Sequence, residues 1–117
     1  MNKTLTIAIS TVANNFDKFI NEFNFNYLAG ADEVLVICQG DISIKFPAKL
    51  DKKIKFIKDV FYGLSRSRNT AILHSTSDYI WFLDDDIILD KESVLKVNAS
   101  ISKQSLEAFT VRMFTGE

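Results

Sequence analysis

Five segments of the chain are rich in β-branched and aromatic residues and are predicted to be strands: residues 5–10, 33–38, 54–57, 79–83 and 108–114. The runs at 34–38 and 79–83 show almost no alternation of apolar and polar positions. Strands of this kind are typical of a parallel sheet that helices cover on both faces. The pattern therefore predicts a mostly parallel sheet.

The segments between these strands have apolar residues at helical spacing. Four apolar residues between positions 16 and 23 fall at i, i+3, i+4 and i+7 and form one stripe, with Asn14 or Asn15 as the expected N-cap. A second helix is predicted with Ser65 as its N-cap and with Ala71, Ile72 and Ser75 on its buried face.

A third helix is predicted over residues 91–102, with Asp90 at its start and Val94, Val97 and Ile101 facing inward. Residues 40–53 show no clear period and are expected to be mostly loop. Strands that alternate with helices in this way predict an α/β fold, a Rossmann-like sheet flanked by helices. No linker or internal repeat is visible, so residues 1–117 are expected to form a single domain.

Composition and charge exclude several classes of protein. The chain has 117 residues, a formal net charge of -1 at pH 7 and one cysteine, Cys38, so it cannot be a disulfide scaffold. The lysines are scattered and give no basic stripe for nucleic acid. The longest apolar runs have five residues, far fewer than the roughly 20 that cross a bilayer. We expect a cytoplasmic protein, with the inner face of the membrane as an alternative location.

Three consecutive carboxylates, Asp84, Asp85 and Asp86, directly follow the apolar run at 79–83. Ligands of open α/β sheets bind at the carboxyl ends of the strands, which is where this triplet would lie. In an extended chain Asp84 and Asp86 would point to one side and Asp85 to the other. Like charges held this close repel, so either one carboxyl is protonated or a cation binds there. Mg²⁺ or Mn²⁺ would suit, because these ions prefer oxygen ligands and leave positions open for phosphates. The triplet therefore indicates nucleotide chemistry, and an acidic turn that caps the next helix is the simpler alternative.

A second motif, residues 63–69 (GLSRSRN), leads into the second predicted helix. Arg66 and Arg68 stand near the start of this helix, where backbone N–H groups favour anions and disfavour cations. A phosphate or the aspartate triplet would explain both arginines, because a guanidinium group binds either one in a bidentate fork. The alternative is that they are exposed residues that only increase solubility.

Together these motifs resemble the nucleotide-binding half of a family 2 glycosyltransferase with the GT-A fold. Residues 9–14 (ISTVAN) resemble the strand-end segment that closes over the nucleotide base. Residues 63–69 resemble the family's Gly, Ser, Ala, Arg, Asn stretch, with Arg68 and Asn69 in register. Residues 78–86 (DYIWFLDDD) are similar to the strand that ends in the DXD metal motif. The resemblance implies a sheet and helices of the GT-A type.

The resemblance also implies roles for residues around the nucleotide. Thr11 and Gln39 would contact the base, and Asp41 is an alternative base contact because the family often has an aspartate-rich turn at this place. Arg68 would lie beside the pyrophosphate or the aspartates. Asp84 and Asp85 would approach the ribose and the metal.

The implied cofactor is Mn²⁺ or Mg²⁺, ligated by Asp86 together with Asp84. The implied reaction transfers a sugar from a nucleotide sugar, by resemblance a UDP-sugar, to the hydroxyl of a glycan or other acceptor. The metal would offset the charge that develops on the departing nucleoside diphosphate. Family members carry an acceptor-binding half and a catalytic carboxylate further along the chain, and no base can be named here. The 117 residues are therefore expected to be part of a longer catalytic domain and inactive alone.

Two other functions fit parts of the sequence. A haloacid-dehalogenase-like phosphatase would use Asp84 as nucleophile and Asp86 as acid/base, with magnesium alongside, but its motif normally follows the first strand. A nucleotide-binding or assembly module without catalysis would use the sheet edge near Val111, Met113 and Phe114 to meet a partner or a second copy of the chain.

Overall fold

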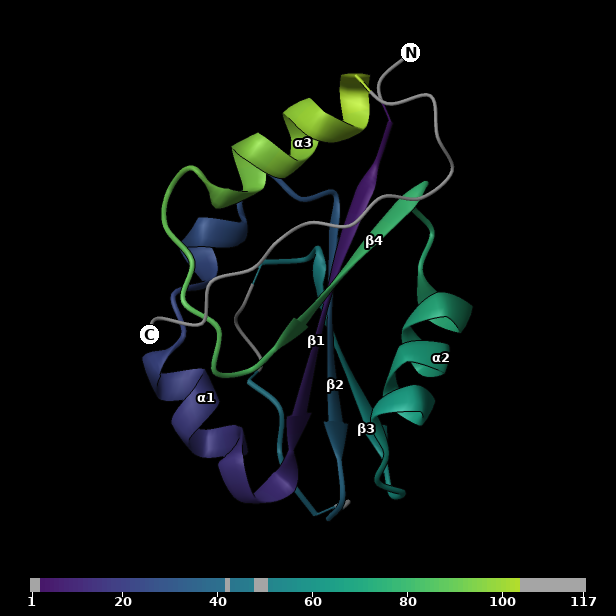
Figure 1. The fold of residues 1–117 in the computed structure, drawn as a ribbon. Coiled ribbons are helices and arrows are strands. Elements are labelled where there is room, and N and C mark those ends of the chain that lie inside the picture. Colours follow the sequence, from purple (N-terminus) through teal and green to yellow (C-terminus); the bar gives the residue numbers. More distant parts are fainter. Residues whose placement is uncertain (1–2, 42, 48–50, 104–117) are drawn as a thin grey trace.

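The computed structural model describes residues 3–41, 43–47 and 51–103 (Figure 1). Strands and helices alternate along these residues except between the second and third strands, where no helix is described. Two short 3-10 segments, Ala13–Asn15 and Phe25–Leu28, flank the first helix. The expected strand at 108–114 lies outside the described residues. The main elements are β1 (Leu5–Val12), α1 (Phe16–Glu22), β2 (Glu33–Gln39), β3 (Ile54–Asp59), α2 (Leu64–His74), β4 (Tyr79–Asp84) and α3 (Ser93–Lys103).

The four described strands form one parallel sheet in the order β3-β2-β1-β4. Helices α1 and α3 lie over one face of this sheet and α2 lies over the other (Figure 1). Because every strand runs the same way, all the carboxyl ends meet at one edge. In register, Ser10 of β1 is beside Asp84 of β4, and Gln39 of β2 is beside Asp59 of β3. The predicted α/β architecture is confirmed.

Apolar side chains fill both faces of the sheet. Strand β2 is buried along its whole length, as its apolar sequence predicts, because it lies between β1 and β3 and under helices on both sides. In β4, Trp81 and Leu83 are buried toward α1 and α3, whereas Ile80 and Phe82 are half-buried on the α2 side. Side chains of β4 thus pack on both faces, but less completely on the α2 side, because β4 lies at the end of the described strand order and α2 packs mainly over β1 and β2.

Helices α1 and α3 bury the faces that their spacing predicts. Phe16 and Phe19 of α1 are buried, and all three predicted inward residues of α3 are at most 5% exposed. Asp90 lies in the turn before α3, where its carboxylate accepts hydrogen bonds from the Glu92 backbone N–H at 2.8 Å and from Ser93 Oγ at 3.1 Å. Helices α2 and α3 have 11 residues each, and within the described ranges no helix is long and apolar enough to cross a membrane.

Helix α2 differs from its prediction at both its start and its buried face. It begins at Leu64 after Gly63, whose φ of 140° is one that side chains rarely adopt, so Ser65 is inside the helix and does not cap it. Its buried residues are Ser67 and Ala71, whereas Ile72 is 57% exposed. Small side chains four residues apart let this helix lie close to the sheet, which a search for large apolar residues does not anticipate.

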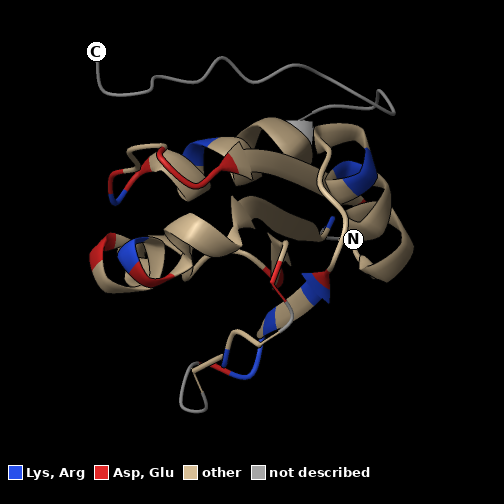
Figure 2. Ribbon diagram, turned by 90° about the horizontal axis from the view of Figure 1, so that it is seen from below, with Lys and Arg blue, Asp and Glu red and all other residues tan. Residues whose placement is uncertain are grey.

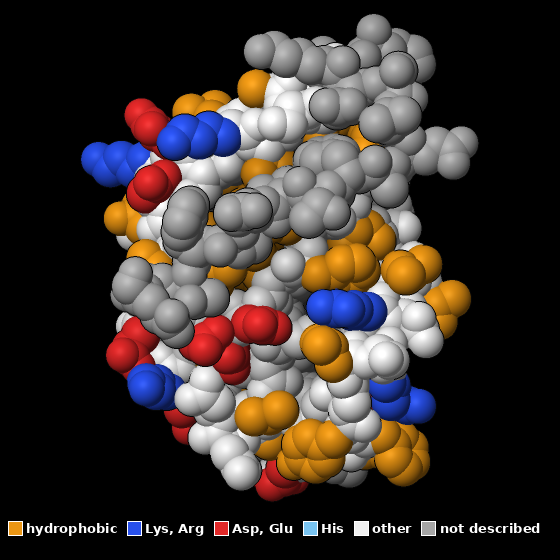
Figure 3. Space-filling view, in the orientation of Figure 1, with side chains coloured by type: hydrophobic (Ala, Val, Ile, Leu, Met, Phe, Trp, Pro, Cys, Tyr) orange, Lys and Arg blue, Asp and Glu red, His pale blue; other side chains and the backbone are white. Residues whose placement is uncertain are grey.

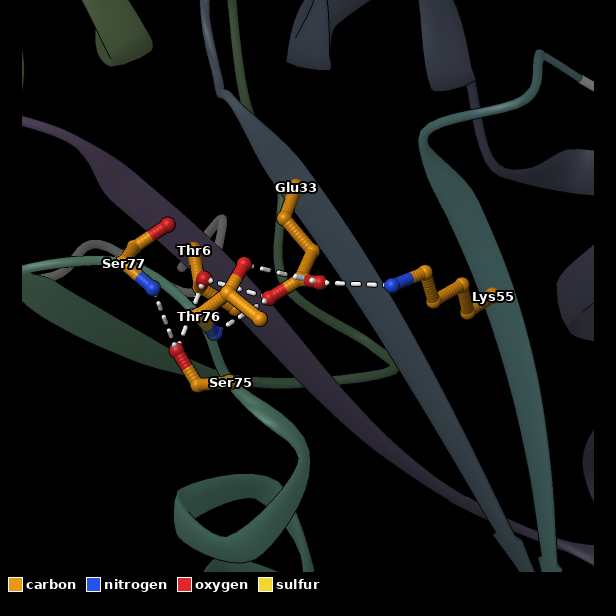
Figure 4. A network of polar contacts seen from close by, with 6 residues as sticks. All are labelled: Thr6, Glu33, Lys55, Ser75, Thr76 and Ser77. Carbon is orange, nitrogen blue, oxygen red and sulfur yellow. Dashed lines mark hydrogen bonds and ion pairs between the residues drawn. The ribbon is translucent and has the colours of Figure 1, made fainter.

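A buried carboxylate joins three strands to the α2–β4 connection at the amino ends of the strands (Figure 4). Glu33 of β2 accepts hydrogen bonds from Thr6 Oγ1 at 2.9 Å, from Lys55 Nζ at 2.9 Å and from the Thr76 backbone N–H at 3.1 Å. Ser75 Oγ in turn donates to Thr6 Oγ1 at 2.9 Å. Burial by itself raises the pKa of Glu33, but these hydrogen bonds and the Lys55 charge hold that pKa below its ordinary value.

Candidate functional site

A cleft of about 410 Å³ opens at the carboxyl ends of β1, β2 and β4, beside the first turn of α2. Two chemically different groups face each other across it. Carboxylates from the end of β4 lie on one part of the wall, and residues of the β3–α2 connection lie on another. Ligands of parallel α/β sheets bind at this edge. The lining residues are Ser10, Thr11, Val12, Gln39, Tyr62, Gly63, Leu64, Ser67, Asp84, Asp85 and Asp86.

All three consecutive aspartates line the cleft. Strand β4 ends at Asp84, and the chain then turns, with the Ile87 N–H donating to the Asp84 carbonyl at 3.4 Å. The strict alternation expected for an extended chain therefore does not hold. Asp84 and Asp86 are exposed and Asp85 is half-buried. Acidic residues are visible on the segment after β4 from the carboxyl ends of the strands (Figure 2), and acidic side chains gather on the same region of the surface (Figure 3).

The middle aspartate is held by residues from the end of β1 and the start of α1. Oδ2 of Asp85 accepts a hydrogen bond from Thr11 Oγ1 at 2.6 Å and another from Asn15 Nδ2 at 2.8 Å. Thr11, predicted to contact the base, is 3% exposed, and its hydroxyl donates to the carboxylate. The sequence brings Asn15 forward only as a helix cap, yet in the structure it makes no side-chain cap bond and binds Asp85 instead.

Asp84 and Asp86, the predicted metal ligands, present exposed carboxylates to the cleft. Within the described ranges, no three side chains of His, Cys, Asp or Glu are grouped so that they could hold a metal ion by themselves. Mg²⁺ and Mn²⁺ are commonly held by one or two carboxylates together with substrate phosphates and water, so the donor set present here fits such an ion. A cation at this place would also relieve the repulsion among three adjacent negative charges.

Gln39, the second residue predicted to contact the base, is 5% exposed and bonds to the β3–α2 connection. Its Nε2 donates to the Gly63 carbonyl at 2.9 Å, and its Oε1 accepts from the Gly63 N–H at 3.2 Å. Asp41, the alternative base contact, is exposed, accepts from the Ser43 N–H at 2.8 Å and is not among the residues that line the cleft.

The two arginines of the 63–69 motif have different partners. Arg66 Nε donates to Asp59 Oδ2 at 2.6 Å, and its guanidinium lies 4.7 Å from the ring centroid of Phe61. The Arg66 hydrogen bond is the main reason that the pKa of Asp59 lies below its ordinary value. Arg68 is exposed, with its guanidinium 5.7 Å from the ring centroid of Phe82 on the α2 side of the sheet, and it is not among the cleft-lining residues. The bond to Asp59 therefore explains why an arginine stands at position 66, a question that the sequence left open.

A second hollow of about 380 Å³ lies on the other side of the aspartates, between α1 and the segment that follows β4. Asp85 and Asp86 line both hollows, whereas Asp84 lines only the first. Asn15 and Tyr27 contribute to the wall of the second one. The acidic turn therefore forms a partition, and its middle carboxylate is fixed by the bonds from Thr11 and Asn15.

The parallel sheet with helices on both faces and a polar cleft at its carboxyl edge defines a Rossmann-like α/β domain. The model of the family described as Glycosyl transferase family 2 matches residues 13–115. The chain therefore belongs to this family. The assignment confirms the resemblance seen in the sequence and does not favour the haloacid-dehalogenase-like alternative.

A solved structure supports the same fold. Residues 1–349 of TarS from S. aureus superpose with a TM-score of 0.60 at 21% sequence identity, covering 86% of this chain and 32% of that one. The chain therefore spans about a third of the length of the structure it matches, and the fold is that of a GT-A nucleotide-binding half. No curated protein sequence matches the chain.

Proposed function

We propose that the chain binds a nucleotide sugar in the cleft beside Asp84, Asp85 and Asp86 with a divalent cation, and that it serves transfer of the sugar to an acceptor hydroxyl. One observation carries this proposal. Three adjacent carboxylates and the first turn of α2 line the same cleft at the carboxyl ends of the strands. Membership in Glycosyl transferase family 2 supports the reaction class.

The two charged features of the cleft suit a diphosphate. The first N–H groups of a helix have no partner within the helix and carry partial positive charge, and Leu64, the first residue of α2, lines the cleft. Those N–H groups favour the negatively charged phosphates. Asp84 and Asp86 would hold Mn²⁺ or Mg²⁺, which when bound offsets the charge that grows on the departing nucleoside diphosphate.

The proposed donor is a UDP-sugar, and the acceptor is a glycan or another molecule with a hydroxyl. Asp85 differs from its neighbours in this proposal, because its bonds to Thr11 and Asn15 give it a supporting role within the acidic turn. We assign no catalytic base within residues 1–117. The single-domain boundary at 1–117 remains a prediction, as does pairing between copies of the chain.

A thermal-shift titration tests the proposal. UDP and two UDP-sugars, each with and without MnCl₂, should raise the melting temperature, and the rise should depend on the metal. Asp86→Asn should abolish the metal-dependent part while leaving the protein folded. Asp17→Asn is the matched control, because Asp17 is an exposed aspartate on α1 that does not line the cleft. Absence of a shift with every nucleotide, with or without metal, would overturn the proposal.

A further inference from the structure

The wall of the cleft opposite the aspartates carries an aromatic ring that the proposed function has not used. Tyr62 lies in the β3–α2 connection, lines the cleft and is 62% exposed. The neighbouring residues of the connection are also apolar and exposed, and hydrophobic side chains are visible at the lower right of Figure 3, where β3 passes into α2. A tyrosine at this exposure forgoes much of the stabilisation that burial of its ring would give.

Contact with the end of β2 positions the Tyr62 ring. A Cβ at Gly40 would collide with Tyr62 Oη and would lie 2.9 Å from Tyr62 Cζ. The φ of Gly40 is 116°, a conformation that favours glycine. The phenol end of the ring therefore rests directly on the backbone of residue 40.

A polar network fixes the connection that carries Tyr62. Gln39 holds both backbone groups of Gly63, directly after Tyr62. Asp59 accepts from the Phe61 N–H at 3.2 Å, directly before Tyr62, and from Arg66 Nε at 2.6 Å. The connection is thus tied to the ends of β2 and β3 on both sides of the exposed ring, so the ring is preorganised at the cleft.

The same network occupies the amide of Gln39. Its Nε2 and Oε1 both bond to the backbone of Gly63. Gln39 is only 5% exposed, and its bonds to the loop fix the orientation of its amide, so little of the amide is open to the edge of a base. Stacking on an aromatic face does not need this amide, because every base has a π-face.

We propose that Tyr62 forms the stacking surface for the base of the bound nucleotide, and that the nucleotide lies with its base against Tyr62 and its diphosphate toward the aspartates. This inference rests on the proposed function, since it places the nucleotide in the same cleft. The base would then be bound by the ring of Tyr62 and not by Gln39.

Binding of UDP and of inorganic pyrophosphate, each measured by calorimetry with MnCl₂, separates a base contact from a phosphate contact. Loss of a base stack typically weakens binding by about 5- to 150-fold, so Tyr62→Ala should weaken UDP binding within this range. Pyrophosphate binding should change by less than about twofold, because it has no base. Tyr62→Phe keeps the ring and should bind UDP like the parent protein. Leu73→Ala is the matched control, since Leu73 is 83% exposed on α2 and does not line the cleft.

The outcomes distinguish this inference from the proposed function. If the parent protein binds neither UDP nor pyrophosphate, the proposed function fails before any variant is compared. If UDP binds but Tyr62→Ala binds it as tightly as the parent protein, the stacking inference is overturned and the proposed function stands. Equal weakening of UDP and pyrophosphate would also overturn it, because Tyr62 would then act only on the shape of the cleft. Circular dichroism of each variant confirms that the fold is retained.

Discussion

Asn15 Nδ2 donates a hydrogen bond to Asp85 Oδ2 over 2.8 Å, and this contact joins the start of α1 to the acidic turn after β4. Thr11 Oγ1 donates to the same oxygen at 2.6 Å. One carboxylate of the triplet is therefore fixed by neutral donors from within the protein, while Asp84 and Asp86 on either side are exposed. The arrangement holds the turn so that the two flanking carboxylates face the cleft.

Replacing Asn15 tests this support. Asn15→Ala removes one hydrogen-bond donor to the charged Asp85 carboxylate. We expect the free energy of unfolding to fall by about 1 kcal/mol. This value is at the low end for a hydrogen bond to a charged group, because Asp85 is only half-buried. Manganese-dependent binding of UDP should weaken as the turn loosens. Urea unfolding and calorimetry measure the two effects. Asn21→Ala, on an exposed position of the same helix, should change neither.

Much of the fold could be predicted from the sequence, because the spacing of apolar residues along the chain indicates which side chains are buried. Strand β2 reads as a continuous apolar run and is buried throughout, and α3 buries the three residues that its spacing picks out. The location of the acidic turn at the carboxyl edge followed from the parallel sheet. These features depend only on the period of the backbone and on which side chains avoid water.

The partners of the site residues could not be predicted, because they come from distant elements. Arg66 is bound by Asp59. Arginines at the start of a helix could equally have a phosphate as partner, and the sequence does not distinguish the two. Asn15 has a side chain suited to capping α1, yet it binds Asp85, 70 residues away. Ser67 shows the same limit for packing, since its burial follows from close approach of α2 to the sheet and not from its own hydropathy.

Gln39 is expected to matter more for stability than for choice of base. Gln39→Ala removes both hydrogen bonds to the backbone of the exposed Gly63, and each such bond typically contributes about 0.5–1.5 kcal/mol. Urea unfolding should show a loss in this range. The relative affinities for UDP, CDP and GDP should be the same in the variant as in the parent protein. A changed order of preference would show that Gln39 reads the base.

The buried Glu33 predicts a dependence of stability on pH. Its folded-state pKa lies below the ordinary value of 4.5, so the charged form stabilises the fold above that value and the contribution is lost as the pH falls through the folded-state pKa. Glu33→Gln should lower the free energy of unfolding at pH 7 by about 2 kcal/mol, because it removes the charge that binds Lys55 and weakens the bonds to Thr6 and Thr76.

Urea unfolding at a series of pH values from 7 to 3 checks this sign. The difference between the parent protein and Glu33→Gln should be largest at neutral pH and should shrink as the pH falls below 4.5. Glu22→Gln, at an exposed position of α1, is the matched control and should follow the parent curve. A difference that stays constant over the whole range would mean that the ionised form of Glu33 contributes nothing beyond its shape.

Two glycines with positive φ offer a way to separate backbone strain from the contact with Tyr62. A Cβ at Gly63 would lie 3.8 Å from Arg66 Cβ, an ordinary van der Waals contact, so Gly63→Ala introduces backbone strain without a collision. The expected loss of stability is about 1–2 kcal/mol. Gly40→Ala has a similar strain and also a collision with the Tyr62 ring, so its loss of stability should be larger.

The double variant Gly40→Ala with Tyr62→Ala should recover the part of the loss that the collision causes. A double-mutant cycle measured by urea unfolding gives this coupling directly, and strictly additive losses would show that the ring does not rest on residue 40.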